Sequence, residues 1–256
     1  AACQAAVASG ALGRRGPDAA GSETLALGDD GVSGRLHLHA AVLHLRGSKP
    51  VEQPVILGES GARLLFNGEI FSVRAPAAAA GLAADAAWTV ASAESCSASS
   101  TAHSSWGPSL DESDTLWLAS QVQECQDMTE SGDLMALASR LSLLLERLQG
   151  PFSIVLWVPQ RKALLCARDK LGRRSLLLAR TGQGDVCLSS APELSAESWT
   201  ELPVTGIFAF EMSDPAHPVV RHLPWQQPGH FAQDWWWPRA ELAVASGVES
   251  SWTAES

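Results

Sequence analysis

The sequence has no long apolar stretch and little cysteine. The leucine-rich segment 141–148 is interrupted by Glu146 and Arg147, and no run approaches the roughly 18 residues of a membrane-spanning helix. Residues 1–10 have no basic start followed by an apolar run, so we expect no secretory signal. The chain has five cysteines and no Cys-x-x-Cys pair, which excludes a zinc ribbon and argues against a disulfide framework. We therefore expect reduced thiols in a cytosolic or nuclear compartment, with the cytoplasm as the expected location.

Positive charge is also scarce. The formal net charge is −10, which argues against general nucleic-acid binding, because phosphate neutralisation needs clustered Lys and Arg. Residues 75–139 contain no Lys or Arg, and residues 193–256 contain only two. Two interpretations are open: chance combined with solvated charged faces, or one domain built from 1–74 and 140–192 that an acidic insertion interrupts and an acidic tail follows.

The hydrophobic content of 46% is enough for a packed core. Alternating leucines predict a strand within 34–46, and 62–67 reads as a second strand. Leucines at helical spacing predict a helix over 132–148, and another helix begins near Ser113 or Asp114. Further strands are predicted at 152–158, 163–168, 175–178 and 185–189. These elements indicate an α+β domain with sheets packed against amphipathic helices.

Residues 75–105 differ in composition from the segments on either side. Of these 31 residues, 20 are Ala or Ser, and the Ser-rich half has no periodicity. We therefore expect a low-complexity, expanded insertion over 75–110. Residues 213–256 contain Pro, Trp and Ser with little periodicity and are expected to form a tail or linker.

Four short polar clusters are candidates for a functional site, although each alone is typical of a turn. They are RRGPD at 14–18, HLR at 44–46 with Gln53-Pro54, NGEIF at 67–71, and ARDKLGRR at 167–174. With SDT at 113–115 and GPF at 150–152, their order resembles the glutaminase domain of class II glutamine amidotransferases, N-terminal-nucleophile hydrolases that include asparagine synthetases.

The resemblance implies a fold and a reaction. The fold is a four-layer αββα sandwich, with two antiparallel sheets between helices and the amidotransferase domain over residues 1–212. The reaction is hydrolysis of glutamine to glutamate and ammonia, which an asparagine synthetase uses to make asparagine from aspartate.

The resemblance also implies residue roles that fit the chemistry of glutamine. Arg46 would hold the α-carboxylate with two parallel N–H donors, and Asp114 would neutralise the α-ammonium. The side-chain amide of Asn67 and the backbone N–H of Gly68 would donate to the oxyanion. Because glutamine is short, these four residues should lie within roughly 10 Å of one another. The alternatives are an ordinary strand-end charge for Arg46 and a helix N-cap for Asp114.

The nucleophile is where the sequence departs from the family. The family attacks with a Cys that is the first residue and is followed by Gly-Ile. Here Cys3 follows two residues and precedes Gln4, so the nucleophile is unknown and we expect no glutaminase activity from the chain as written. No segment matches a Ser-Gly-Gly phosphate-binding loop, so ATP and Mg²⁺ are expected only for a missing C-terminal synthetase domain. A catalytically inactive binding or scaffolding module is the alternative function.

Other candidate groups receive no catalytic role. His37, His39 and His44 lack a carboxylate or Cys at fixed spacing, so no metal site is predicted. Arg168 and Asp169 are expected to form a structural ion pair in a turn. The expected partners are therefore glutamine or glutamate and the synthetase domain, without nucleic acid, membrane or a cofactor in this chain.

Limited proteolysis is expected to cut the folded chain first within residues 75–105, because exposed low-complexity insertions open at little cost. Mass spectrometry of the early fragments checks this expectation. First cuts within 140–192 would contradict the division of the chain into a domain with an insertion.

Overall fold

The computed structural model describes residues 11–28, 34–74, 107–109, 111–130, 132–180, 186–192, 199–213 and 218–226. Most of the predicted insertion over 75–110, Cys3, and the chain after residue 226 lie outside these residues. The described part of the chain contains no helix long and apolar enough to cross a membrane.

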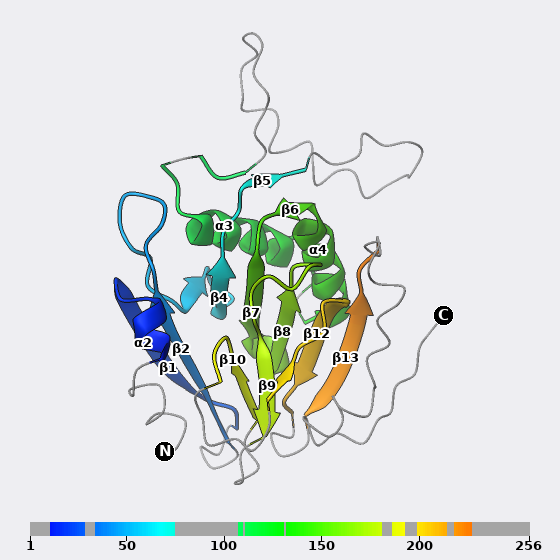
Figure 1. Ribbon diagram of the computed structural model, residues 1–256. Coiled ribbons are helices and arrows are strands. Elements are labelled where there is room, and N and C mark those ends of the chain that lie inside the picture. Colours follow the sequence, from blue (N-terminus) through cyan, green and yellow to red (C-terminus); the bar gives the residue numbers. More distant parts are fainter. Residues whose placement is uncertain are drawn as a thin grey trace, which may run out of the picture.

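A six-stranded antiparallel sheet forms the centre of the molecule (Figure 1). Its central strands are β7 (Phe152–Val158) and β8 (Ala163–Arg168), joined through the 3-10 turn η2 (Pro159–Arg161). Both strands have the bounds expected from the sequence. β7 is buried on both faces except for Val155, as its continuous apolar run predicts. The other strands, from the two edges inward, are β13 (Val219–Pro224) with β12 (Gly206–Glu211), and β3 (Val55–Leu57) with β4 (Ala62–Gly68).

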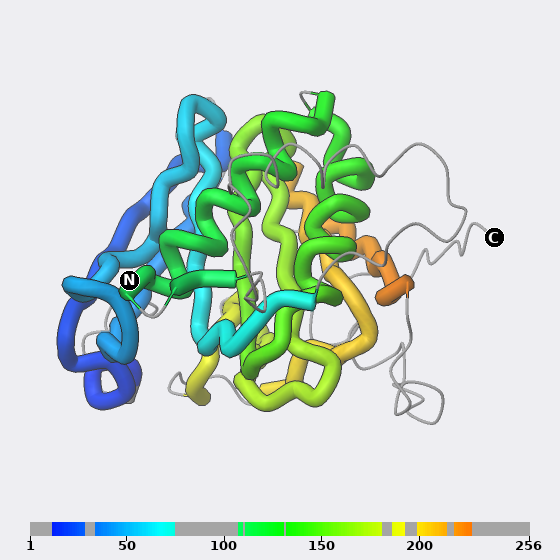
Figure 2. Tube along the Cα trace, turned by 90° about the horizontal axis from the view of Figure 1, so that it is seen from above, coloured from blue at the N-terminus to red at the C-terminus, as the bar shows by residue number. Residues whose placement is uncertain are grey.

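Two helices cover one face of this sheet. α3 (Asp114–Asp127) and α4 (Leu134–Arg147) lie across the sheet in the view from above (Figure 2). α4 begins after Asp133, whose side chain accepts a hydrogen bond from the N–H of Ala136 at 2.9 Å. The leucines at helical spacing in α4 are buried against alternate residues of β4, β7, β8 and β12. The predicted helix over 132–148 is therefore confirmed within two residues at each end.

The opposite face of the sheet packs against a second layer of strands. This layer contains the hairpin of β1 (Ala19–Ala26) and β2 (Arg35–Val42), and a three-stranded sheet of β9 (Leu177–Arg180), β10 (Val186–Ser189) and β11 (Thr200–Glu201). A second core forms between the layers, where Leu38 and Leu178 pack with Trp157, Cys166 and Phe208. The expected α+β sandwich of antiparallel sheets is confirmed. Besides α3 and α4, the described residues contain one α-helix, α2 (Ala11–Arg15), which lies beside β2.

Some strands were not evident from the sequence. β13 pairs with β12 along its whole length, so the central sheet extends beyond residue 212, where the sequence analysis placed the start of a tail. β9 lies two residues later than the strand predicted at 175–178. β1 was missed because it contains one large apolar residue, Leu25. A short pair, β5 (Ser72–Val73) with β6 (Leu148–Gln149), connects the end of α4 to the NGEIF segment.

Leu141 and Leu143 provide a matched test of this core, because both are in α4. The Leu141 side chain is 1% exposed and that of Leu143 is 41% exposed. Leu141→Ala is expected to lower the free energy of unfolding by about 2–5 kcal/mol, because it leaves a cavity between α4 and the sheet. Leu143→Ala is expected to change it by less than about 1 kcal/mol. Urea unfolding checks both values, and equal effects would contradict the packing.

Candidate functional site

Arg46 and Asp114 meet at the backbone of Ile70. Arg46 Nη1 lies 2.8 Å from Asp114 Oδ1 and donates to the carbonyl oxygen of Ile70 at 2.9 Å. The N–H of Ile70 donates to Asp114 Oδ2 at 3.1 Å. The side chains are 23% and 11% exposed, respectively, so the pair is shielded but reachable from solvent. Two residues 68 positions apart in the sequence are therefore held at one point.

The RGPD motif supports the turn that carries Arg46. The carboxylate of Asp18 accepts from the backbone N–H of His44 at 2.7 Å, and Pro17 bridges to Val42 at the end of β2. Gly47 then adopts a φ of +93°, a conformation that other residues rarely adopt. A Cβ at Gly47 would lie 3.2 Å from the backbone nitrogen of Ser113. The glycine thus lets the turn approach the start of α3, where Asp114 lies.

Asp114 does not cap its own helix. It is the first residue of α3, Ser113 is in the N-cap position, and the Ser113 side chain makes no capping hydrogen bond. Both carboxylate oxygens of Asp114 are used outside the helix, for Arg46 and for Ile70. The N-cap alternative for Asp114 is therefore wrong, because the carboxylate joins α3 to the NGEI segment.

Asn67 and Gly68 close the end of β4, three and two residues before Ile70. The side-chain Nδ2 of Asn67 is buried and has no hydrogen-bond partner among the described residues. An unpaired buried donor is destabilising unless an acceptor can reach it. A Cβ at Gly68 would overlap the carbonyl oxygen of Pro151, so glycine is needed here for the close approach of β4 to β7. This reason for the glycine is one of packing between the two strands.

Gln53 fixes the strand that ends in Asn67, a role that sequence analysis missed. Its buried side chain donates to the carbonyl oxygen of Phe66 at 3.0 Å and accepts from the N–H of Phe66 at 2.7 Å. The same Nε2 lies 3.5 Å from the hydroxyl of Thr115 in α3. The sequence signal for this role was the presence of the QP, NGEI and SDT motifs together. In the structure, Gln53 of the first motif contacts Phe66, just before the second, and lies near Thr115 of the third.

Arg168 and Asp169 do not pair with each other, which corrects the sequence expectation. Arg168 is buried and binds Glu201 and the carbonyl oxygens of Leu202, Gly172 and Arg174. Asp169, also buried, accepts from the N–H of Phe152, from the N–H groups of Leu171 and Arg173, and from Arg173 Nε. Successive side chains in an extended segment point to opposite faces of the sheet. Arg168 and Asp169 therefore find their partners on different sides.

The 169–175 loop reaches back to the NGEI segment. Arg174 Nη2 donates to Glu69 Oε1 at 2.9 Å, and Ser153 Oγ donates to the carbonyl oxygen of Ser175 at 3.4 Å. Ser153 is the direct neighbour of Asn67 across β4 and β7. Arg174 Nε is a second buried donor without a partner among the described residues. The segment after β4 is therefore held by α3 at Ile70 and by this loop at Glu69.

No described cysteine is suited to nucleophilic attack. Cys125, Cys166 and Cys187 are buried free thiols. Burial raises the pKa of the Cys125 thiol to about 12, with a smaller contribution from Glu124, and burial also raises the pKa of Cys166. The thiolate is the attacking form, so both groups are inert near neutral pH. Cys3 and Cys96 lie outside the described residues.

His37 and His39 of β2 differ in their surroundings. His37 Nδ1 lies 3.0 Å from the hydroxyl of Thr24 on β1, and burial lowers the pKa of His39. Within the described ranges, no group of three His, Cys, Asp or Glu side chains is placed to hold a metal ion.

The comparisons with known proteins first give a class. Residues 112–196, a third of the chain, match a family model described as a glutamine amidotransferase domain. Among solved structures, the chain is similar to a glutamine phosphoribosylpyrophosphate amidotransferase from B. subtilis, with 14% identity and a TM-score of 0.39. That similarity covers 67% of this chain and 31% of the other chain.

Curated relatives then give a more particular similarity. The chain is similar to an asparagine synthetase domain-containing protein of Drosophila melanogaster, with 25% identity over 86% of this chain and 30% of the relative. It is also similar to asparagine synthetase domain-containing protein 1 of Homo sapiens, with 29% identity over 84% of this chain and 27% of that protein. The chain thus spans about 30% of the length of these relatives. The resemblance found in the sequence motifs is confirmed, and the similarities support a glutaminase-like domain.

The raised pKa values give a test of which thiols can react. With a pKa of about 12, roughly one Cys125 thiol in ten thousand is a thiolate at pH 8. Iodoacetamide at pH 8 is therefore expected to leave Cys125 and Cys166 unmodified in the folded protein and to alkylate them in urea. Peptide mass spectrometry reads out both states. Alkylation at the same rate in both states would contradict the burial of these thiols.

Proposed function

We propose that this chain is the glutaminase-like domain of an asparagine synthetase-related protein and binds glutamine at the Arg46–Asp114 pair. In the complete protein, it hydrolyses glutamine to glutamate and ammonia. The ammonia passes to a C-terminal synthetase domain that uses ATP and Mg²⁺ to make asparagine from aspartate. The observation that carries this proposal is the meeting of Arg46, Asp114 and the backbone of Ile70, three residues after Asn67, whose buried side-chain amide has an unpaired N–H donor.

The charges of the site match those of an α-amino acid. In the free protein, Arg46 and Asp114 neutralise each other. A zwitterion supplies one positive and one negative group, so its ammonium takes Asp114 and its carboxylate takes Arg46. One ion pair is exchanged for two, and no partly buried charge is left without a partner. The planar guanidinium suits the carboxylate, because it can donate two parallel hydrogen bonds.

Asn67 is proposed to bind the side-chain amide of glutamine, at the end away from the α-carbon. Its Nδ2 group is an unused donor at the end of β4, close in sequence to the segment that Asp114 holds. Donation to the amide oxygen of bound glutamine would satisfy it, and the interaction would strengthen as that oxygen becomes negative. Gly68 N–H is the second proposed oxyanion donor. The attacking group is not assigned to any residue of this chain.

Two further proposals concern the compartment and the alternative function. We propose the cytoplasm, in line with the free thiols of the three described cysteines. The alternative function, a catalytically inactive module, uses the same residues to bind glutamine or glutamate without turnover. Binding and turnover therefore have to be measured separately.

Calorimetric titration with L-glutamine and L-glutamate tests the binding site. Arg46→Lys is expected to weaken binding by about 1–3 kcal/mol, because lysine cannot reproduce the paired N–H donors. Arg35→Lys, at an exposed position of β2, is the control and is expected to bind as the parent does. Absence of binding by the parent chain, or unchanged binding by Arg46→Lys, would contradict the glutamine site.

Glutamate release from L-glutamine is measured on the same samples. We expect no turnover by the chain as written, since no positioned donor replaces an attacking group. Turnover that Cys3→Ala abolishes would overturn that expectation and assign the nucleophile to Cys3. The binding result stands independently of this outcome.

A further inference from the structure

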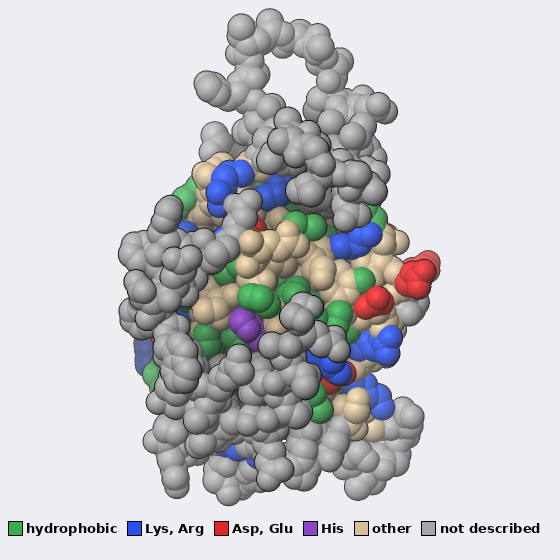
Figure 3. All heavy atoms as spheres, turned by 90° about the vertical axis from the view of Figure 1, so that its right-hand side faces the viewer, with side chains coloured by type: hydrophobic (Ala, Val, Ile, Leu, Met, Phe, Trp, Pro, Cys, Tyr) green, Lys and Arg blue, Asp and Glu red, His purple; other side chains and the backbone are tan. Residues whose placement is uncertain are grey.

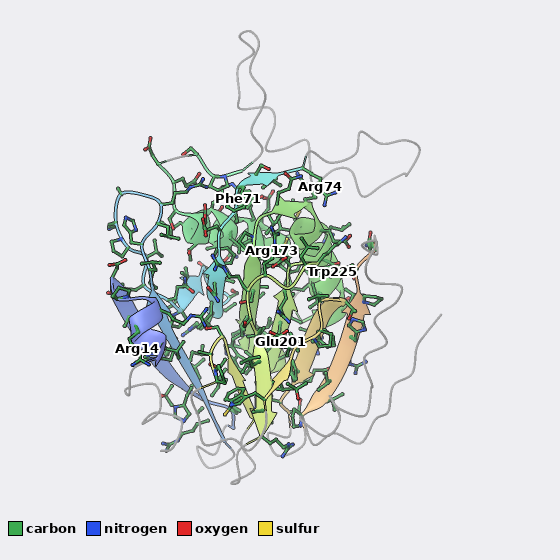
Figure 4. The ribbon with its side chains drawn as sticks, viewed as in Figure 1. Arg14, Phe71, Arg74, Arg173, Glu201 and Trp225 are labelled. Carbon is green, nitrogen blue, oxygen red and sulfur yellow. The ribbon has the colours of Figure 1, made fainter. Side chains whose placement is uncertain are left out.

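A pocket lies apart from the four residues proposed for glutamine. It has a volume of about 280 Å³ and is formed by the end of α4, β6, the residues on either side of β5, the 169–173 loop and Trp225. None of Arg46, Asn67, Gly68 and Asp114 lines it. Figure 4 labels Phe71, Arg74, Arg173 and Trp225, which reach this region from three segments, since Phe71 and Arg74 flank β5. Its volume corresponds to about nine water molecules.

The floor of the pocket is apolar, and two large apolar side chains are exposed at its rim. Leu148 and Phe152 line it and are buried, as is Trp225. Phe71 is 62% exposed and Leu171 is 61% exposed, although both line the same pocket from positions 100 residues apart. Side chains of this kind gain free energy when a ligand removes them from water.

The two acidic groups of the pocket are already saturated. Asp169 accepts four hydrogen bonds, two at each carboxylate oxygen. Glu146 accepts from Lys170 Nζ at 3.0 Å, from the N–H of Gln226 at 2.6 Å and from the hydroxyl of Ser142 at 3.3 Å. Lys170 also lies 6.0 Å from the centre of the Trp225 ring. These carboxylates therefore have little capacity left for a cationic ligand.

The two arginines, in contrast, have unused donors. Arg74 donates through Nη2 to the carbonyl oxygen of Glu146, and Arg173 donates through Nε to Asp169 and through Nη2 to the carbonyl oxygen of Gly150. In the described part of the chain, no acceptor is recorded for the other N–H groups of either guanidinium. Both side chains are exposed, and basic side chains also appear across the upper part of the face in Figure 3. Arginine donors of this kind suit oxyanions.

We propose that this pocket binds a small organic anion, in which a carboxylate or phosphate group is attached to a flat apolar body. The oxyanion takes the free donors of Arg74 and Arg173, and the apolar body lies between Phe71 and Leu171 above Trp225. A neutral ligand would leave the guanidinium donors unused. An inorganic anion would leave the apolar rim in water. The pocket has room for a single-ring ligand, and this binding goes beyond the proposed glutamine site.

Phenylacetate and phenyl phosphate are probes of the required size and chemistry, and benzyl alcohol is the neutral control. In NMR titrations of the 256-residue chain, at least one anion is expected to bind at least tenfold more tightly than benzyl alcohol. The stronger of the two anions identifies the oxyanion as carboxylate or phosphate. Equal binding of the alcohol and both anions, or no binding of either anion, would overturn the proposal.

Three substitutions locate the binding. Arg74→Gln and Leu171→Ser change exposed side chains and are expected to weaken binding of the preferred anion at least fivefold, whereas Arg35→Gln on β2 leaves it unchanged. Thermal unfolding of each variant checks that the fold is retained. Unchanged affinity in both pocket variants would overturn the proposal. Saturating L-glutamine is expected not to displace the probe, and displacement would show that the two sites are one.

Discussion

Two adjacent buried charges, Arg168 and Asp169, organise the parts of this structure that meet at the end of the central sheet. A buried charge is strongly destabilising unless it is paired and hydrogen-bonded, and each of these has four hydrogen bonds. Arg168 connects β8 to Glu201 in the second layer and to the loop that ends at Arg174. Asp169 connects the same loop to Phe152, the first residue of β7. The loop is therefore fixed from both faces of the sheet.

The position of Asn67 follows from this arrangement. Arg168 holds the carbonyl oxygen of Arg174, and the Arg174 side chain binds Glu69, two residues after Asn67. From the other side, the N–H of Glu69 donates to the carbonyl oxygen of Pro151, and Gly68 allows the close approach that this bond needs. An oxyanion donor has to be held in place before the reaction if it is to stabilise a transition state. The charged loop therefore fixes the segment that carries Asn67, the proposed oxyanion donor.

The sequence predicted the elements that local pattern determines and missed those that depend on distant partners. The strands 152–158 and 163–168 and the helix of α4 have apolar runs or helical spacing strong enough to define them. β13 was missed because half of its residues face solvent and its pairing partner, β12, was not itself recognised. The motif residues of the site were found and Arg46 was expected near Asp114, as the structure shows, but the individual hydrogen bonds were not predicted. Asp114 binds both Arg46 and Ile70, and Arg168 and Asp169 bind other groups and not each other. These contacts depend on the geometry of loops, which no local sequence pattern encodes.

Residues 69–71 are shared by the two sites, and their geometry separates them. Every backbone N–H of this segment is bound: Glu69 to Pro151, Ile70 to Asp114, and Phe71 to the carbonyl oxygen of Gln149. Ile70 presents its peptide groups to the Arg46–Asp114 pair, whereas the next side chain, Phe71, lines the pocket at the end of α4. Residues 69–71 contribute to both sites, so a substitution within this segment would disturb both of them. Substitutions of side chains that reach each site from elsewhere, Arg46 on one side and Arg74 on the other, are therefore the ones that can distinguish the two proposed sites.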